Sequence, residues 1–443
     1  LALEARPGWL RAVTAAPRLP PVPSPAAGAS SAPLYRQARW QMTAFLAVAA
    51  SLNFADRAAM SAVLSALRVD LQLSDLALGL LGSFFLWSYA LGSPWAGIIA
   101  DRWPRQRIVI VSLVGWSVVT ALTGLVSSFP ALLALRIGLG LSESLFFPAA
   151  FALIAQHHLT DTRAKAMSVM TVGINCGMVL GGSAAGYLAQ HYGWRAGFLV
   201  FGLLGVGLAL LAKPFLPTPG GGAATPARAR FGDTVRTLVR IPTYWAMVAE
   251  SMMSGMGMWI FFSWLPLYLR ETYSMSLAAA GFAGTFMLQI AVMAGIAVGG
   301  WLSDRVAVKG NHRRVLAYGA SYALAAPFLL VFLGEPDFAV IAAGIAAFSF
   351  LRGVGQSNDH PTLCEIVPTN MSSTCIGLMY ACATASCGCG VLLAGFLKED
   401  VGLHGVFAGI SGAFLLAGGI MLFTYWRWSR DVFARARAAE AAA

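Results

Sequence analysis

Gly97-Ile-Ile-Ala-Asp101-Arg102 has the pattern Gly-x-x-x-Asp-Arg, and this pattern occurs again in the chain at Gly300-Trp-Leu-Ser-Asp304-Arg305. The two copies lie 203 residues apart. Three further residues recur with unchanged internal spacing, 209 residues apart: Gly186, Gly193 and Phe198 return as Gly395, Gly402 and Phe407. Two anchors in nearly the same register indicate that the chain consists of two repeated halves.

Long apolar segments surround both copies. The chain of 443 residues is 58% hydrophobic and only 11% charged, with a mean hydropathy of +0.70. A transmembrane helix needs about 20 mainly apolar residues. Twelve segments meet this requirement: 40–66, 74–100, 107–128, 130–156, 164–189, 194–216, 242–268, 276–302, 314–333, 338–357, 371–397 and 404–427. The sequence therefore predicts an all-α membrane protein with twelve transmembrane helices in two pseudo-symmetric six-helix bundles.

The segments outside these spans divide the chain. Residues 1–39 are rich in Pro, Ala and Ser, which predicts a disordered cytoplasmic arm and not a signal peptide. A Pro- and Gly-rich stretch lies within residues 217–241, which we expect to be a cytoplasmic linker. We thus expect an N-terminal bundle over 40–216, a C-terminal bundle over 242–428 and a cytoplasmic tail over 429–443.

The net charge of +11 is distributed unevenly along the chain. If the N-terminus is cytoplasmic, 23 of the 30 Lys and Arg residues fall in the cytoplasmic segments. Cytoplasmic loops of membrane proteins carry this excess. We therefore expect a monomeric, multi-pass protein of the cell membrane, the inner membrane in a bacterium, with both termini in the cytoplasm. The charge then faces the lipid bilayer surface, and nucleic acid is not an expected partner.

Asp56 and Arg57 interrupt the first apolar segment side by side. A charge at bilayer depth costs a few kcal/mol or more, so such residues usually face the bundle interior and mark a substrate or proton path. Asn53 shares a helical face with this pair at spacings of three and four residues. The sequence leaves open the alternative of a structural ion pair between helices.

Arg136 and Glu143 form a second charged set, in the segment 130–156. Glu143 lies about 13 residues, or about 20 Å, into that helix, near the membrane midplane. Burial there penalises the charged carboxylate and favours its protonated form, as a proton carrier requires. Arg136 lies two turns earlier on the same face. A permanent bond between Glu143 and Arg136, or another arginine, is the structural alternative for both residues.

These residue types divide naturally between two tasks. Carboxyl groups exchange protons, whereas arginine keeps its charge and pairs bidentately with carboxylates. We therefore predict that Asp56 and Glu143 couple protons and that Arg57 anchors an anionic ligand. Other candidate ligand contacts are polar or aromatic residues of both halves: Asn53, Tyr89, Arg136, Gln289, Tyr380 and Thr384. Glu250 and Arg352 are isolated ionisable residues that fit no motif.

Several other chemistries lack support in the sequence. There is no Gly-x-x-x-x-Gly-Lys phosphate-binding motif and no metal-ligand spacing among the six His and six Cys residues. We expect no enzymatic activity, no cofactor and no metal. The glycines of segment 164–189 are expected to let helices approach closely: Gly173, Gly177, Gly181, Gly182 and Gly186.

From Trp40 to Trp428 the chain resembles the major facilitator superfamily, whose loop signature is Gly-x-x-x-Asp-Arg followed by basic residues. This resemblance implies alternating access between two six-helix halves. It also implies a role in conformational gating for residues of both copies of the signature: Gly97, Asp101, Arg102, Arg105, Asp304 and Arg305.

Finer segments are similar to the anion:cation symporter branch of that superfamily: Leu52-Asn-Phe-Ala-Asp56-Arg57, Arg136 to Glu143 with Phe147-Pro148, Trp264-Leu-Pro-Leu-Tyr-Leu269 and Gly377-Leu-Met. Spinster-type lipid carriers share the first motif and the glutamate. Symporters of the branch often have Tyr at the place of Phe54 and Asn at the place of Tyr380. These departures favour an anion with fewer hydroxyl groups than a sugar acid.

The resemblance thus implies a secondary active transporter that moves a small organic anion, a carboxylate or sugar acid, together with protons. The alternative is a Spinster-like, proton-linked carrier of lysolipids or other amphiphiles. Drug efflux is less favoured, because no Gly-Pro follows the glycines of segment 164–189. A membrane sensor on the same fold is also less favoured, because the C-terminal tail is short.

Overall fold

The computed structural model describes residues 33–158, 160–216, 238–239, 241–308, 310, 312–334, 337–367 and 372–429. All regular elements in these ranges are helices. Helices are expected in lipid, where each backbone polar group needs an internal partner. Most of the predicted arm (1–39), linker (217–241) and tail (429–443) lies outside the described residues, and their boundaries stay predictions.

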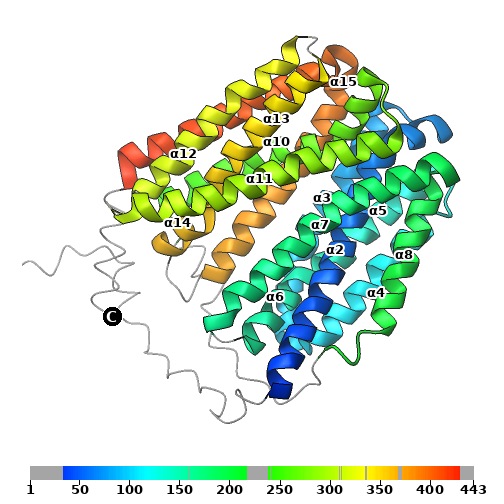
Figure 1. Cartoon of the computed structure of the whole chain (residues 1–443), viewed down its shortest axis with the longest axis horizontal. Helices are drawn as coiled ribbons and strands as arrows, with labels where there is room; N and C mark the ends of the chain where they lie inside the picture. The colour runs from blue at the N-terminus through cyan, green and yellow to red at the C-terminus, as the bar shows by residue number, and fades with distance from the viewer. Residues whose placement is uncertain are drawn as a thin grey trace, which may run out of the picture.

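The described residues of the N-terminal half form seven helices, drawn in blue to green in Figure 1. They are α2 (Pro33–Asp70), α3 (Asp75–Arg102), α4 (Arg105–Thr123), α5 (Phe129–Ser144), α6 (Phe146–His157), α7 (Thr160–Tyr192) and α8 (Trp194–Leu210). Local sequence accounts for several ends. Ser74 caps α3 by accepting a hydrogen bond from the Ala77 backbone N–H at 3.2 Å, and Pro130 occupies the first turn of α5.

The C-terminal half follows a similar plan, drawn in green to red. Its elements are α10 (Pro242–Tyr273), α11 (Leu277–Val308), α12 (Arg313–Ala325), the 3-10 helix η1 (Ala326–Leu333), α13 (Phe338–Gln356), α14 (Asp359–Ile366), α15 (Ser372–Thr424) and the π-helical η2 (Tyr425–Ser429). The short α14 was not predicted from the sequence, because its eight residues are too few and too polar for a span.

The internal repeat of the sequence is also a repeat of backbone geometry. Gly193, between α7 and α8, has φ 84° and ψ 156°. Its counterpart Gly402, inside α15, has φ 66° and ψ 169°. Both glycines occupy the left-handed half of backbone space, which other residues rarely adopt. Gly402 therefore divides α15 into two helices at the position that corresponds to the α7–α8 junction.

Nine helical segments in the described residues are long and apolar enough to cross a membrane. One of them, Thr374–Trp428, has 55 residues and contains the Gly402 joint, so its length suits two crossings. The helix α8 is shorter, with 17 residues, and α2 begins at Pro33 instead of 40. The all-helical membrane fold is as predicted, and helices occupy all twelve predicted spans, whereas the number of crossings stays a prediction.

Glycines bring neighbouring helices together, as predicted for segment 164–189. A methyl group added at Gly177 or Gly181 would collide with the backbone of α2 at Ser51 or Ala55. On the opposite side of α7, Gly182 is similarly close to Gly281 of α11. The glycines of α7 therefore hold α2 on one side and the other bundle on the other side.

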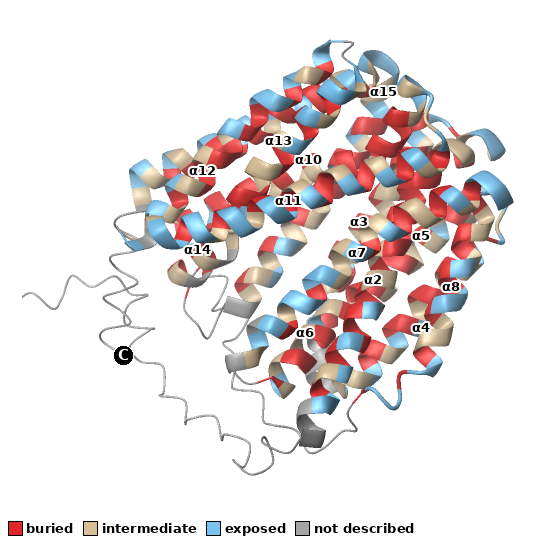
Figure 2. Cartoon of the chain, in the orientation of Figure 1, coloured by how far each residue is buried: buried red, intermediate tan, exposed pale blue. Residues whose placement is uncertain are grey.

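The two bundles meet through α7 against α11 and through α3 against α15. Among the described residues, the hydrogen bonds and ion pairs that join the bundles lie between mid-height and one end, where α2 ends and α3 begins. Figure 2 shows buried residues where these helices face each other. This end is called the closed end below.

Candidate functional site

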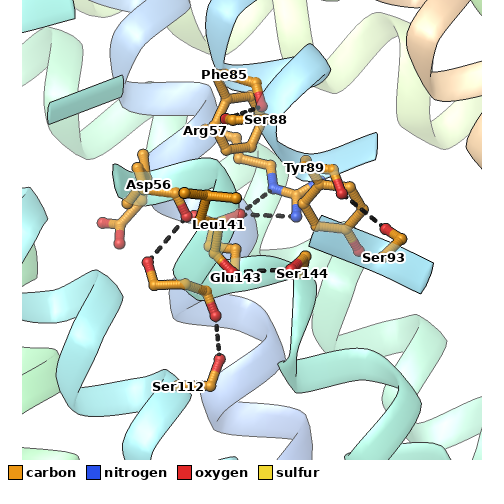
Figure 3. A network of polar contacts seen from close by, with 12 residues as sticks. Asp56, Arg57, Phe85, Ser88, Tyr89, Ser93, Ser112, Leu141, Glu143 and Ser144 are labelled. Carbon is orange, nitrogen blue, oxygen red and sulfur yellow. Dashed lines mark hydrogen bonds and ion pairs between the residues drawn. The ribbon is translucent and has the colours of Figure 1, made fainter. Parts of the chain in front are cut away.

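A buried ion pair between α2 and α5 forms the centre of the site (Figure 3). Arg57 donates from Nε to Oε2 of Glu143 at 2.8 Å, and its Nη2 lies 2.7 Å from the same oxygen. The Glu143 side chain is fully buried, and that of Arg57 is 6% exposed. The second carboxylate oxygen of Glu143, Oε1, has no hydrogen-bond partner. The pair thus retains one acceptor that can receive a proton.

A close helix contact brings Glu143 to this place. A methyl group added at Gly140 would overlap the Phe85 carbonyl oxygen and the Ser88 hydroxyl of α3. Because Gly140 has no side chain, α5 packs directly on the α3 backbone there. Glu143, three residues further along α5, then faces Tyr89 and the arginine from α2. The predicted same-face arrangement of Arg136 and Glu143 holds, since both side chains are buried in the bundle.

Asp56 points in a different direction from Arg57 (Figure 3). Its Oδ2 accepts a hydrogen bond from the Thr120 hydroxyl of α4 at 3.1 Å, while Oδ1 has no partner. The residue is 2% exposed and interacts electrostatically with Glu143 and with Arg57. The two predicted proton-coupling carboxyl groups therefore belong to one buried charged cluster.

Two further predicted residues lie in the same cluster. Arg136 is 3% exposed, interacts electrostatically with Glu143 and Asp56, and places its guanidinium 5.5 Å from the ring centre of Phe198. Asn53 is fully buried near Glu143, yet neither polar atom of its amide has a hydrogen-bond partner. Its donor and acceptor are therefore available to a ligand.

Three aromatic rings surround the Arg57 guanidinium. Its central carbon lies 4.6 Å from the ring centre of Phe54, 4.9 Å from that of Tyr89 and 5.1 Å from that of Phe85. Tyr89 was predicted as a ligand contact, and its ring lies against the Arg57 guanidinium. The two phenylalanines were not predicted as site residues. The sequence did contain one indication of their place: Phe54 lies three residues before Arg57 and Phe85 four residues before Tyr89, which puts each on the same helical face as a predicted site residue.

A small cavity adjoins the Arg57 side chain between the bundles. Its volume is about 40 Å³, which holds a few water molecules and no larger ligand. Both arginines line it, together with mainly apolar side chains of α2, α3, α10 and α15: Met60, Leu64, Leu78, Leu81, Phe85, Leu86, Trp259, Phe262, Trp264 and Val391. A substrate could reach these walls only if the bundles separate further.

The three ligand contacts predicted in the C-terminal half do not line this cavity. Gln289 of α11 is 6% exposed and donates from Nε2 to the Met178 sulfur of α7 at 2.9 Å, so it joins the bundles. Tyr380 and Thr384 lie one turn apart on α15, Tyr380 being 46% exposed. In this conformation the predicted contacts of the N-terminal half come together, and those of the C-terminal half remain apart from them.

The repeated Gly-x-x-x-Asp-Arg motif lies at the C-terminal ends of α3 and α11. The side chains of Asp101 and Arg102, and the surroundings of Gly97, fall outside the described residues. Arg105 donates to Gln156 Oε1 at 3.1 Å. In the second copy, Arg314 of α12 lies 3.4 Å from Asp304, and Arg305 stacks 3.7 Å from the Trp301 ring centre. These three contacts each stay within one bundle.

An ion-pair network at the closed end was not predicted. Arg68 of α2 lies 2.9 Å from Glu271 of α10, and Lys398 of α15 lies 3.0 Å from Asp75 of α3 and 2.9 Å from Glu271. The network therefore joins the two bundles. The sequence placed both cations in outer loops, but it did not show which carboxylates they meet.

A neighbouring ion pair at the closed end stays within the N-terminal bundle. Asp70 accepts hydrogen bonds from Arg195 Nη1 at 2.7 Å and from Trp194 Nε1 at 3.1 Å. These two donors, Arg195 first, hold the pKa of the Asp70 carboxyl below its ordinary value of 3.8. This pair serves below as a control for the network that joins the bundles.

Glu250 of α10 is a fully buried carboxyl away from the Arg57 site. It accepts hydrogen bonds from the hydroxyls of Tyr318 and Ser251, and among the described residues no cation lies within ion-pair distance of it. The Arg352 guanidinium interacts with it electrostatically. The hydrogen-bond partners of Glu250 are thus tyrosine and serine hydroxyls.

A buried charged cluster inside the N-terminal bundle lies beside a small cavity between the two bundles, an arrangement typical of membrane transporters. The sequence pattern of the Major Facilitator Superfamily matches residues 46–387. The chain belongs to this superfamily.

Similar proteins include organic-anion transporters. The cis,cis-muconate transport protein of Acinetobacter baylyi is 27% identical over 86% of this chain and 92% of its own length. The hexuronate transporter of Bacillus subtilis is 25% identical over 86% of this chain and 91% of its own length. A bacterial homologue of the lysosomal transporter Spinster, solved in an inward-facing, unoccupied conformation, superposes with a TM-score of 0.71. It covers 90% of this chain and 98% of its own at 20% identity, which shows the shared fold.

Proposed function

We propose that this protein is a symporter that carries a small organic anion together with protons by alternating access. The buried Arg57–Glu143 pair carries the proposal. Relatives of similar length are named as transporters of muconate and hexuronate, both carboxylates, which supports an anionic substrate. The proposed sites are Asp56 and Glu143 for protons and Arg57 for the substrate carboxylate.

Competition for one guanidinium provides the coupling. With Glu143 ionised, Arg57 is occupied by the short ion pair between them. Protonation of Glu143 removes its negative charge and frees the guanidinium fork for another carboxylate. A buried arginine without a partner is strongly unfavourable, so the freed Arg57 favours the entry of an anion. Substrate and proton therefore bind together.

Asp56 and Arg136 adjust this exchange. Asp56 holds one oxygen on Thr120 and has the other free, so it can accept a second proton without losing its place. Arg136 lines the same cavity and keeps positive charge at the site while Glu143 is protonated. The free amide of Asn53 provides a neutral contact for the bound carboxylate.

Alternating access requires the bundles to open at one end while they close at the other. In the present conformation the closed end is joined by Arg68, Asp75, Glu271 and Lys398. The distribution of Lys and Arg favours a cytoplasmic location for both termini, which puts the closed end outside and the opposite end inside. We propose this orientation in the cell membrane, with a monomer as the working unit.

Transport into proteoliposomes tests the proposal. Benzoate, cis,cis-muconate, glucuronate and a lysolipid are supplied outside vesicles with an inward proton gradient, and uptake and internal pH are recorded. Symport predicts saturable uptake of a carboxylate with additional acidification of the lumen. The alternative carrier of amphiphiles, with the same apolar cavity walls, predicts lysolipid movement and no carboxylate uptake.

A further inference from the structure

The surroundings of Arg57 narrow the class of carboxylate. We infer that the substrate body attached to the carboxylate is planar and apolar, as in an aromatic or conjugated acid, and not polyhydroxylated as in a sugar acid. This inference rests on the proposed function, because it assumes that Arg57 binds the substrate carboxylate. It distinguishes between the ligand classes named for the two relatives, muconate and hexuronate.

The first observation is the set of rings around the anchor. Phe54, Tyr89 and Phe85 each place a ring centre between 4.6 and 5.1 Å from the Arg57 guanidinium carbon. A carboxylate that binds this guanidinium must bring its first carbon atoms against these rings. A flat, unsaturated group can lie against a ring in an offset stack or edge to face, which adds to the binding energy.

The second observation is the chemistry of the cavity walls. Trp259 and Phe262 of α10 face Phe85 and Met60 of the other bundle across the cavity beside Arg57. Apart from the two arginines, the polar side-chain groups among the residues that line it are the hydroxyls of Ser61 and Ser263 and the indole N–H groups of Trp259 and Trp264. The Trp264 N–H already donates to the Val391 carbonyl at 3.3 Å. The Ser61 hydroxyl already donates to the Ala58 carbonyl at 3.2 Å.

The few polar groups decide against a sugar acid. A hexuronate has several hydroxyl groups, and each one buried without a partner weakens binding by roughly 5- to 150-fold. Asn53 and the serines cannot satisfy all of them. A planar apolar acid has no hydroxyl groups that need partners. When it enters, its apolar surface takes the place of the contacts that the apolar residues lining the cavity make with each other. The residues that line the cavity thus weaken the binding of hydroxylated acids more than they strengthen the binding of any particular ring.

Binding to the purified, full-length protein tests this inference with four matched probes. Benzoate is planar and apolar, cyclohexanecarboxylate has a ring that is not planar, glucuronate is polyhydroxylated, and benzamide lacks the charge. Isothermal titration or thermal stabilisation gives the affinity for each. We expect benzoate to bind at least 10-fold more tightly than glucuronate, cyclohexanecarboxylate to fall between them, and benzamide not to bind.

Two single variants separate the rings from general packing. Phe85→Leu removes a ring beside Arg57 but keeps an apolar side chain, and we expect benzoate affinity to fall roughly 3- to 10-fold. Phe84→Leu is the control, because Phe84 packs on Trp87 and does not line the cavity. Equal benzoate affinities of the two variants would overturn the role of the rings.

The outcomes distinguish this inference from the proposed function. Glucuronate that binds as tightly as benzoate, with binding lost in Arg57→Ala, would overturn the inference and leave the anion symporter intact. Stabilisation by a lysolipid and by none of the carboxylates would overturn the proposed function itself. If benzamide binds as tightly as benzoate, the carboxylate charge does not contribute to binding, and Arg57 is not its partner.

Discussion

Arg57 Nε and Glu143 Oε2 are 2.8 Å apart in the buried interior of the N-terminal bundle, although 86 residues separate them along the chain. The pair joins α2 to α5 and leaves Glu143 Oε1 without a partner. Breaking such a buried pair by removing one partner typically costs about 3–5 kcal/mol. Protonation of Glu143 lowers that cost, which is why the pair can work as a switch.

Replacement of Glu143 by glutamine should abolish proton-driven accumulation while substrate exchange across the membrane remains measurable. The amide resembles the protonated acid, so the bundles still move with substrate bound but no proton is carried. Counterflow and gradient-driven uptake are measured on the same proteoliposomes. Glu250→Gln, a change to a buried carboxyl elsewhere, is the control and should keep coupling. Normal accumulation by Glu143→Gln would make this acid structural.

Arg57→Lys should keep the charge of the anchor but lose its bidentate geometry. We expect the affinity for a transported carboxylate to fall by about 1–3 kcal/mol, the range of one charged hydrogen bond. Arg57→Ala should abolish carboxylate binding. The single variant Arg57→Ala leaves Glu143 buried and unpaired, which could also prevent folding. The double variant Arg57→Ala/Glu143→Gln removes both charges and therefore checks that a loss of binding is not a loss of folding. Unchanged carboxylate affinity in a folded double variant would argue against the anchor.

Lys398→Met should weaken the closed end, because Lys398 contacts Asp75 of one bundle and Glu271 of the other. Loss of about 1 kcal/mol changes the population of the outward-open state roughly 5-fold. The readout is the rate at which an impermeant thiol reagent labels Ser263→Cys, a cavity position, in protein without its six native cysteines. Arg195→Met breaks a pair inside one bundle and is the control. Equal labelling rates would show that the network does not hold the bundles together.

The same control pair predicts a pH dependence of stability. Because hydrogen bonds from Arg195 and Trp194 lower the pKa of Asp70, they stabilise the folded protein at pH values above 3.8, the ordinary pKa of an aspartate. This contribution disappears as the pH falls through the lowered value. Arg195→Met should therefore have a slightly lower melting temperature than wild type at pH 7, and the difference should narrow below pH 4. A difference that widens in acid would contradict this pairing.

Much of the fold could be predicted from the sequence, because apolar length alone specifies helices in a membrane. The repeat was also visible: Gly193 and Gly402 match in sequence and both have positive φ. The shared helical face of Arg136 and Glu143 follows from helical periodicity. The break of the segment 130–156 at Leu145, between α5 and α6, was not predicted, although Pro148 lies three residues after it and a proline inside a helical segment often marks a break.

The rest of the site depends on which helices meet and at what height. Helical spacing alone did not show that the rings of Phe54 and Phe85 lie against the Arg57 guanidinium, and nothing in the sequence indicates that Lys398 reaches Asp75, 323 residues away. Gln289, Tyr380 and Thr384 were predicted from residue type, and their roles depend on a conformation in which the bundles close around a ligand. Only the positions of the helices relative to each other decide these contacts.

The central claim is that proton and anion cross together because the carboxylates of Glu143 and of the substrate compete for Arg57, so that protonation of Glu143 frees Arg57 for the substrate. The most direct measurement is the internal pH of proteoliposomes that contain wild-type protein or Glu143→Gln, recorded when cis,cis-muconate or benzoate is added outside at equal initial pH. The account predicts saturable acidification of the lumen with wild-type protein and none with Glu143→Gln, although the variant still exchanges substrate. Carboxylate uptake by wild-type protein with no change of internal pH, or equal acidification by both proteins, would contradict it.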